Sequence, residues 1–153
     1  MVIKFNFRRM RMRIGTKILV SVVAGAFLLS TGPVLAGTHK TPEAPADYQS
    51  KKAPKAKKKA LKKGKKYYGK KCKKCHGSKG DGKGSSADDL KIPATAFNAP
   101  GYMKGKSDGQ LFWITEKGSK GTDMESFGPG SDVNLSEKKI WMIINYMRKE
   151  FTN

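Results

Sequence analysis

The sequence is poor in the residue types that form metal clusters, and it is also poor in acids. It has two cysteines and two histidines, the smallest set that could close a four-ligand zinc site, and His39 lies far from the other three. Only 12 acidic residues stand against 32 lysines and arginines, which gives a formal net charge of +20. A field of one sign favours an anionic partner, which could be nucleic acid, an acidic membrane surface or an acidic protein patch.

The first 36 residues have the pattern of a bacterial secretory signal. Basic residues precede an apolar run over 18–29, which Gly32, Pro33 and the small residue Ala36 follow. We therefore expect cleavage after Ala36 and export to the periplasm. An uncleaved membrane anchor is the alternative, although Gly32 and Pro33 would interrupt a spanning helix. Export separates the chain from DNA and RNA, so no nucleic-acid binding is expected in spite of the charge.

Residues 37–58 are predicted to form a flexible basic tether. They are rich in Pro, Ala, Lys and Thr and have almost no large apolar residue. Such a segment cannot bury enough surface to offset the entropy that the chain loses on ordering. Its lysines predict a peripheral contact with anionic lipid head groups, each contributing ~1 kcal/mol near the surface.

Residues 59–153 are predicted to form one small all-α domain, because no run alternates well enough to indicate a strand. A first helix is expected over 60–71, with Leu61, Gly64 and Tyr68 on one face. The expected architecture is three to four short helices with long loops. These helices would bury little apolar surface, so a large apolar cofactor is expected to complete the core.

Two further helices are indicated by their ends and their periodicity. Ser107 and Gln110 form a capping-box pattern before an apolar run, and Gly118 is the expected stop. The last helix is expected to begin near Asn134 or Ser136. Its apolar residues recur at helical spacing, which makes it amphipathic: Ile140, Ile143, Ile144 and Met147.

The most specific feature is the C-x-x-C-H motif formed by Cys72, Cys75 and His76. This is the attachment signature of c-type haem. One helical turn presents both thiols to the two haem vinyl groups, and the next histidine reaches the iron from the same side. Zinc, a redox dithiol and a structural disulfide are the alternatives. The dithiol would follow a strand in a βαβ unit, and a disulfide across so short a loop would add little stability.

The sixth iron ligand is expected to be a methionine, and Met124 is favoured. It lies in a long glycine-containing loop, which can bring a thioether over the open face of the haem without breaking a helix. Methionines on helices usually fill gaps in the core. The other candidates are Met103, Met142 and Met147.

With these motifs in place, residues 60–150 resemble the class I cytochrome c family, in the expected order. The haem site, the methionine loop "GTDMESFG" and the last helix "LSEKKIWMIINYMR" carry the resemblance, together with Gly64, Tyr68 and Gly77. It implies that the first and last helices cross at Gly64, beside Tyr68, Trp141 and Tyr146. It also makes Pro93 the candidate whose carbonyl orients His76. Glu125 stands where the family usually has a proline after the ligand methionine.

The expected function is that of a monohaem electron carrier with one covalently attached haem c, and not an enzyme. Ligation by His76 and Met124 leaves no open iron position, which favours electron transfer over substrate binding. Lysines crowd around the attachment site, where an acidic redox partner could dock transiently. The alternatives are a haem subunit of a larger oxidoreductase complex, or a haem sensor or enzyme with an open iron site.

Overall fold

The computed structural model describes residues 40–153, so the predicted signal over 1–36 and His39 lie outside it. No strand occurs in the described residues, and the all-α prediction is confirmed. The three helices expected from the sequence are the three longest. The helices are α1 (Ala46–Gln49), α2 (Lys58–Lys71), α3 (Lys73–His76), α4 (Tyr102–Gly105), α5 (Asp108–Lys117) and α6 (Glu137–Phe151).

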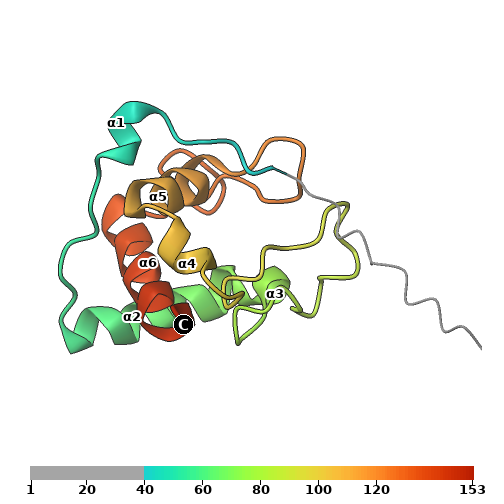
Figure 1. The fold of residues 1–153 in the computed structure, drawn as a ribbon, viewed down its shortest axis with the longest axis horizontal. Helices are drawn as coiled ribbons and strands as arrows, with labels where there is room; N and C mark the ends of the chain where they lie inside the picture. The colour runs from blue at the N-terminus through green and yellow to red at the C-terminus, as the bar shows by residue number, and fades with distance from the viewer. Residues whose placement is uncertain (1–39) are drawn as a thin grey trace, which may run out of the picture. The chain divides into compact units, whose positions relative to one another are not determined.

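The centre of the domain is the crossing of α2 and α6 (Figure 1). A Cβ atom on Gly64 would lie 2.0 Å from the carbonyl oxygen of Met142, so only glycine lets the two backbones approach this closely. The rings of Tyr68 and Tyr146 pack beside the crossing, with centroids 5.5 Å apart. The expected crossing at Gly64 is therefore confirmed. The close approach explains why a glycine, which lowers helix stability, stands at this position.

The apolar face of α6 covers the core, as its periodicity predicts. Ile140, Ile143, Ile144 and Met147 are all buried and pack with Phe112 of α5. Trp141 lies at the same interface, with its ring centroid 4.4 Å from that of Phe112. Trp141, which the resemblance assigned to the α2 crossing, thus joins α6 to α5.

Helix α5 begins with half of the predicted capping box. Ser107 Oγ accepts a hydrogen bond from the Gln110 backbone N–H at 3.0 Å. The Gln110 side chain does not complete the box, because it binds the chain before α2 instead. Its Oε1 accepts from the Ala44 N–H at 2.7 Å, and its Nε2 donates to the Pro42 carbonyl at 3.0 Å.

Residues 37–58 were predicted to be a flexible tether, and the structure differs from this prediction over residues 42–54, which we call the strap. The strap includes α1 and lies along α5 (Figure 1). A Cβ atom on Gly109 would lie 1.7 Å from the Tyr48 carbonyl oxygen, so the strap backbone rests directly on that glycine. The segment has few apolar residues to bury, and hydrogen bonds from α5 side chains hold it in place instead. The strap is therefore part of the domain.

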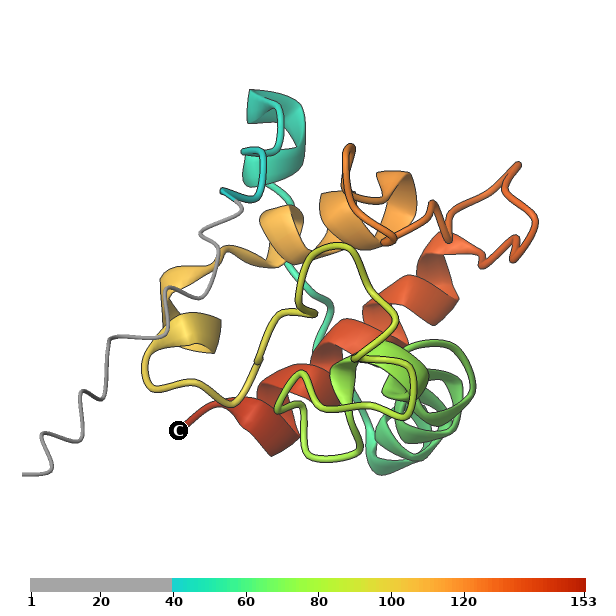
Figure 2. The same cartoon turned by 90° about the vertical axis from the view of Figure 1, so that its right-hand side faces the viewer.

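Long loops join the helices around the site. Residues 77–101 run from α3 to α4, and residues 118–136 run from α5 to α6 (Figure 2). Between residues 40 and 153, none of the helices combines the length and the apolar character needed to cross a membrane.

Candidate haem-binding site

The two cysteines lie one helical turn apart at the junction of α2 and α3. Both the Cys75 and the His76 backbone N–H groups donate to the Cys72 carbonyl, at 3.2 and 2.9 Å. Neither cysteine is in a disulfide, and each residue as a whole is partly exposed. Burial raises the pKa of the Cys72 thiol to about 12, which disfavours the thiolate that a redox dithiol requires. The arrangement fits two thiols that are to be joined covalently to haem.

His76 is held in the orientation expected of an iron ligand. Its ring is buried and stacks on Phe97, with centroids 4.4 Å apart. Its Nδ1 lies 3.0 Å from the Thr95 carbonyl oxygen, which requires the proton on Nδ1 and leaves the Nε2 lone pair to bind a metal. Burial also lowers the pKa of His76, which favours the neutral, metal-binding form.

The carbonyl that orients His76 is not the one that the resemblance suggested. Pro93 is exposed, and the contact is made by Thr95, two residues further along. Both lie in the same "IPATAF" segment, whose Phe97 stacks on the imidazole ring. Sequence could locate this segment but could not choose the residue within it.

The loop after His76 folds back onto the attachment helix, where three of its N–H groups bind carbonyls of α3. Gly82, Gly84 and Ser86 donate to His76, Cys75 and Lys74 respectively, at 3.0, 3.0 and 2.9 Å. A Cβ atom on Gly84 would lie 2.1 Å from the Lys74 carbonyl oxygen. We call residues 77–98 the histidine loop. It fixes the attachment segment through backbone contacts.

Met124 lies in a tight turn at the end of α5, in residues 118–128, which we call the methionine loop. The Met124 N–H donates to Thr122 Oγ1 at 3.0 Å, and its carbonyl accepts from the Ser119 N–H at 2.8 Å. The Met124 side chain is half-buried, whereas that of Glu125 is exposed. The turn therefore fixes the Met124 backbone on both sides.

The two loops meet beside Met124. The Lys91 backbone N–H in the histidine loop donates to Asp123 Oδ2 at 2.9 Å. This contact joins the segment after the proximal histidine to the residue before the candidate methionine. The other candidates occupy different places, because Met103 and Met147 are in the hydrophobic core and the Met142 carbonyl contacts Gly64. Met124 as the sixth ligand stays a prediction.

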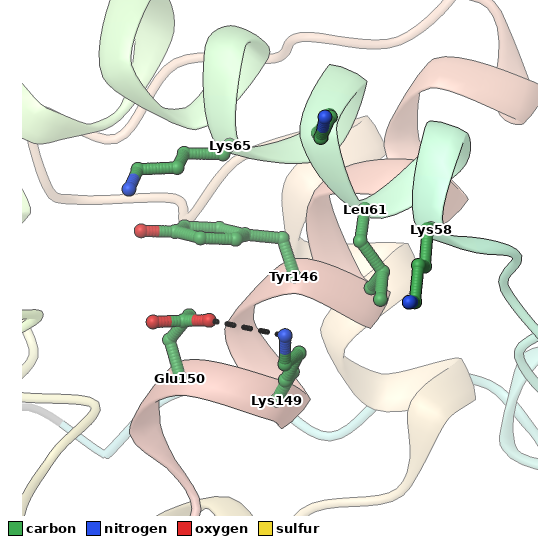
Figure 3. Close-up of a pocket in the computed structure, with 7 residues that line it drawn as sticks. Lys58, Leu61, Lys65, Tyr146, Lys149 and Glu150 are labelled. Atoms are coloured by element: carbon green, nitrogen blue, oxygen red, sulfur yellow. Dashed lines mark ion pairs between the residues drawn. The ribbon is translucent and has the colours of Figure 1, made fainter.

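The surface of α2 carries exposed lysines and no acid. Among the described residues none of these lysines is in an ion pair. Lys58, Lys62 and Lys65 line one shallow groove of about 290 Å³, and Lys59 and Lys63 line another of about 350 Å³. In the first, Lys65 lies over one face of the Tyr146 ring and Glu150 lies beyond the other (Figure 3). The α2 lysine surface consists of Lys58, Lys59, Lys62, Lys63, Lys65, Lys66, Lys70 and Lys71.

The chain matches one known family over the segment that carries the attachment motif. A family model described as cytochrome C oxidase, cbb3-type, subunit III, matches residues 59–147, which is more than half of the chain. The chain belongs to this family of c-type cytochromes. Haem c is therefore its cofactor, and Cys72, Cys75 and His76 supply the donors that suit it. Within residues 40–153 there is no group of three or more His, Cys, Asp or Glu side chains placed to hold a metal ion.

A solved structure shows the same fold. A chain of a reducing HAO-like protein complex from Kuenenia stuttgartiensis is 26% identical, with a TM-score of 0.57, and the match covers 74% of this chain and 53% of that one. Cytochrome cL from the methylotroph Methylophaga aminisulfidivorans is 24% identical, with a TM-score of 0.45, and the match covers 61% of this chain and 56% of that one. This chain thus spans about half the length of each. No curated protein matches the sequence.

Proposed function

We propose that this protein carries single electrons between redox partners in the periplasm, with His76 and Met124 as the two axial iron ligands. The observation that carries the proposal is the hydrogen bond between Lys91 and Asp123, which joins the methionine loop to the histidine loop. With both axial positions filled, the protein has no place for a substrate on the iron. Haem c supplies the one-electron chemistry when bound, and no separate catalytic residue is required.

The residues around the site would each serve electron transfer in a definite way. Thr95 keeps the His76 ring in one orientation and one tautomer, so the ligand does not reorganise when the charge on the iron changes. A methionine thioether is neutral and favours the reduced form of the iron, which raises the reduction potential. Phe97 and the buried core exclude water from the histidine side of the site.

The α2 lysine surface would be the docking surface for an acidic redox partner. Its lysines are exposed and unpaired within the described residues, and α2 leads directly to the attachment cysteines. Association through such charges should be fast, weak and sensitive to salt. Raising the ionic strength should therefore slow reduction by the partner much more than reduction by a small neutral donor.

A second candidate function is that of a haem subunit held in a larger oxidoreductase complex. The matched family is named for an oxidase subunit, and the chain with a TM-score of 0.57 comes from a protein complex. A subunit should co-purify with its partners in high salt, whereas a shuttle should come away alone.

The same preparation tests export, because N-terminal sequencing of the mature protein should find residue 37 first. Salt-reversible binding to anionic vesicles would test the expected membrane contact.

The near-red absorption spectrum of the oxidised protein tests the ligation. The proposal predicts the weak sulfur-to-iron band of thioether ligation in the wild type. It also predicts loss of the band in Met124→Ala with covalent haem retained. Met142→Leu is the matched control and should keep the band. A wild type with covalent haem and no band would contradict the proposal and favour a sensor or an enzyme with an open iron site.

A further inference from the structure

Glu116, near the end of α5, is a buried carboxylate with a partner outside the helix. It is 6% exposed, and its Oε2 accepts a hydrogen bond of 2.6 Å from the Tyr48 hydroxyl of the strap. The Lys117 ammonium lies 3.2 Å from the same oxygen, but its side chain is 55% exposed. A buried carboxylate is costly unless hydrogen bonds satisfy it. Tyr48 is therefore the partner that reaches Glu116 from another element.

Glu116 also contacts the end of the methionine loop. The Glu116 carbonyl accepts from Ser126 Oγ at 2.6 Å and from the Gly128 N–H at 3.0 Å. A Cβ atom on Gly128 would lie 2.3 Å from Glu116 Cγ, so the returning loop rests against the Glu116 side chain. The Phe127 N–H donates to the Thr115 carbonyl at 3.2 Å. The Glu116 backbone thus binds the loop two and four residues after Met124, and its side chain supports Gly128.

The strap that supplies Tyr48 is fixed independently of Glu116. Gln49 accepts from Ser107 Oγ at 2.7 Å and donates to Gln110 Oε1 at 3.3 Å. The Ala53 N–H donates to Asp108 Oδ2 at 2.9 Å, and the other oxygen of Asp108 lies 2.8 Å from an Arg148 nitrogen of α6. These contacts hold the strap at the start of α5, so Tyr48 approaches Glu116 from a fixed support.

We propose that Tyr48 is a positioning residue for Met124 and acts through Glu116. The strap, α5 and the methionine loop form one chain of contacts. This chain limits the opening of the loop and keeps Met124 in the position of the proposed sixth ligand. Loss of the Tyr48 hydroxyl would leave the buried carboxylate with the exposed Lys117 as its side-chain partner. Glu116 would then turn toward water, and the loop that rests on it would open more easily. This inference rests on the proposed ligation by Met124.

The test is to compare Tyr48→Phe with Gln49→Ala in the full-length holoprotein. Tyr48→Phe removes one hydroxyl and keeps the ring near Phe112, where the centroids lie 6.2 Å apart. Gln49→Ala removes three strap hydrogen bonds, none of which touches Glu116. Imidazole is added to the oxidised protein, and the loss of the near-red band is followed. Hydrogen exchange of the 126–128 amides is measured on the same samples.

Tyr48→Phe should need about tenfold less imidazole for half-displacement of Met124, which is the effect of losing one hydrogen bond to a charged group. Its 126–128 amides should also exchange faster. Gln49→Ala should lower the unfolding stability but shift the imidazole midpoint by less than about twofold. If the wild type shows the band and Tyr48→Phe behaves like the wild type, the inference is overturned and the ligation stands.

If the wild type lacks the band, the proposed ligation fails, and the exchange data still decide the role of Tyr48. Faster exchange at 126–128 in Tyr48→Phe but not in Gln49→Ala would show that the hydroxyl holds the loop. Equal exchange in the two variants would mean that Tyr48 adds only general stability, and the inference would be wrong.

Discussion

The histidine loop and the methionine loop hold His76 and Met124 in different ways. The histidine loop returns to the helix that carries the cysteines, and three of its N–H groups bind α3 carbonyls directly. The methionine loop rests on α5, and Glu116 beneath it depends on Tyr48 in a separate segment of the chain. The first arrangement is local and made of backbone. The second depends on side chains that are distant in the sequence.

This difference teaches that the two sides of one site can have unequal stability. Covalent attachment and local backbone contacts should keep His76 in place under conditions that release Met124. Regions with fewer cooperative contacts open at lower free-energy cost than the rest of a fold. Substitutions can weaken one loop alone, change the support that the methionine loop receives, or leave both loops intact.

The largest effect is expected for Gly84→Ala in the histidine loop. The added Cβ would lie 2.1 Å from the Lys74 carbonyl oxygen, a backbone atom that cannot move without disturbing α3. We expect a loss of ~3 kcal/mol in unfolding free energy, typical of severe overpacking. Denaturant unfolding of the holoprotein measures it. The control Gly69→Ala has open space and should stabilise α2 by about 0.5–1 kcal/mol. Equal stability of the two variants would contradict the account.

Gly118→Ala should release Met124 and leave the histidine side intact. Gly118 has φ +77°, and its added Cβ would lie 2.6 Å from the Met124 carbonyl oxygen. We expect ~2 kcal/mol of strain, a weakened near-red band and normal covalent haem. Gly121→Ala is the matched control, because it has φ +82° and no atom within 4 Å. If both variants lose the band equally, backbone strain alone explains the effect and the contact with Met124 does not matter.

High pH should also weaken the support of the methionine loop. The hydrogen bond to Glu116 raises the pKa of Tyr48 from 10.0 to about 12. A folded pKa above the unfolded value means that folding favours the neutral phenol, so the stabilisation is complete below pH 10 and is lost as pH rises through 12. Tyr48→Phe should lack this part of the pH dependence. Identical unfolding profiles of wild type and variant between these pH values would argue against the bond.

The smallest effect on stability is expected on the exposed α2 lysine surface. Lys62→Ala combined with Lys66→Ala removes two exposed like charges, so the unfolding free energy should change by less than about 0.5 kcal/mol. Both loops and the near-red band should be unaffected. Reduction by an acidic partner should become slower and less dependent on salt. Unchanged salt dependence would place the docking surface elsewhere.

Local sequence patterns predicted the parts of the fold that local patterns determine. The face of Gly64 and Tyr68, the cap at Ser107 and the apolar repeat of α6 each depend on residues within one or two turns. These elements lie where the spacing indicated. The attachment motif is equally local, because three residues and one helical turn define it.

Contacts between distant segments could not be predicted in the same way. The composition of residues 42–54 indicated too little apolar surface to offset the entropy that the chain loses on ordering. Side chains of α5 nevertheless bind the backbone of this segment. The signals were Tyr48, a lone aromatic residue in a polar segment, and Gly109, a glycine inside a helix. The sequence does not indicate which segment either residue contacts, because the contacting residue lies about 60 residues away. The same holds for Thr95 and for the Lys91 contact with Asp123.

The most direct test of the central claim, that the methionine loop supplies the sixth ligand, is an NMR spectrum of the reduced protein with labelled methionine methyl groups. The account predicts that one of the four methionines that follow the expected cleavage site, Met124, has a methyl signal moved far upfield by the haem ring current and that Met124→Leu removes this signal. An upfield signal that survives in Met124→Leu and disappears in a variant of Met103, Met142 or Met147 would contradict the account, as would the absence of any such signal.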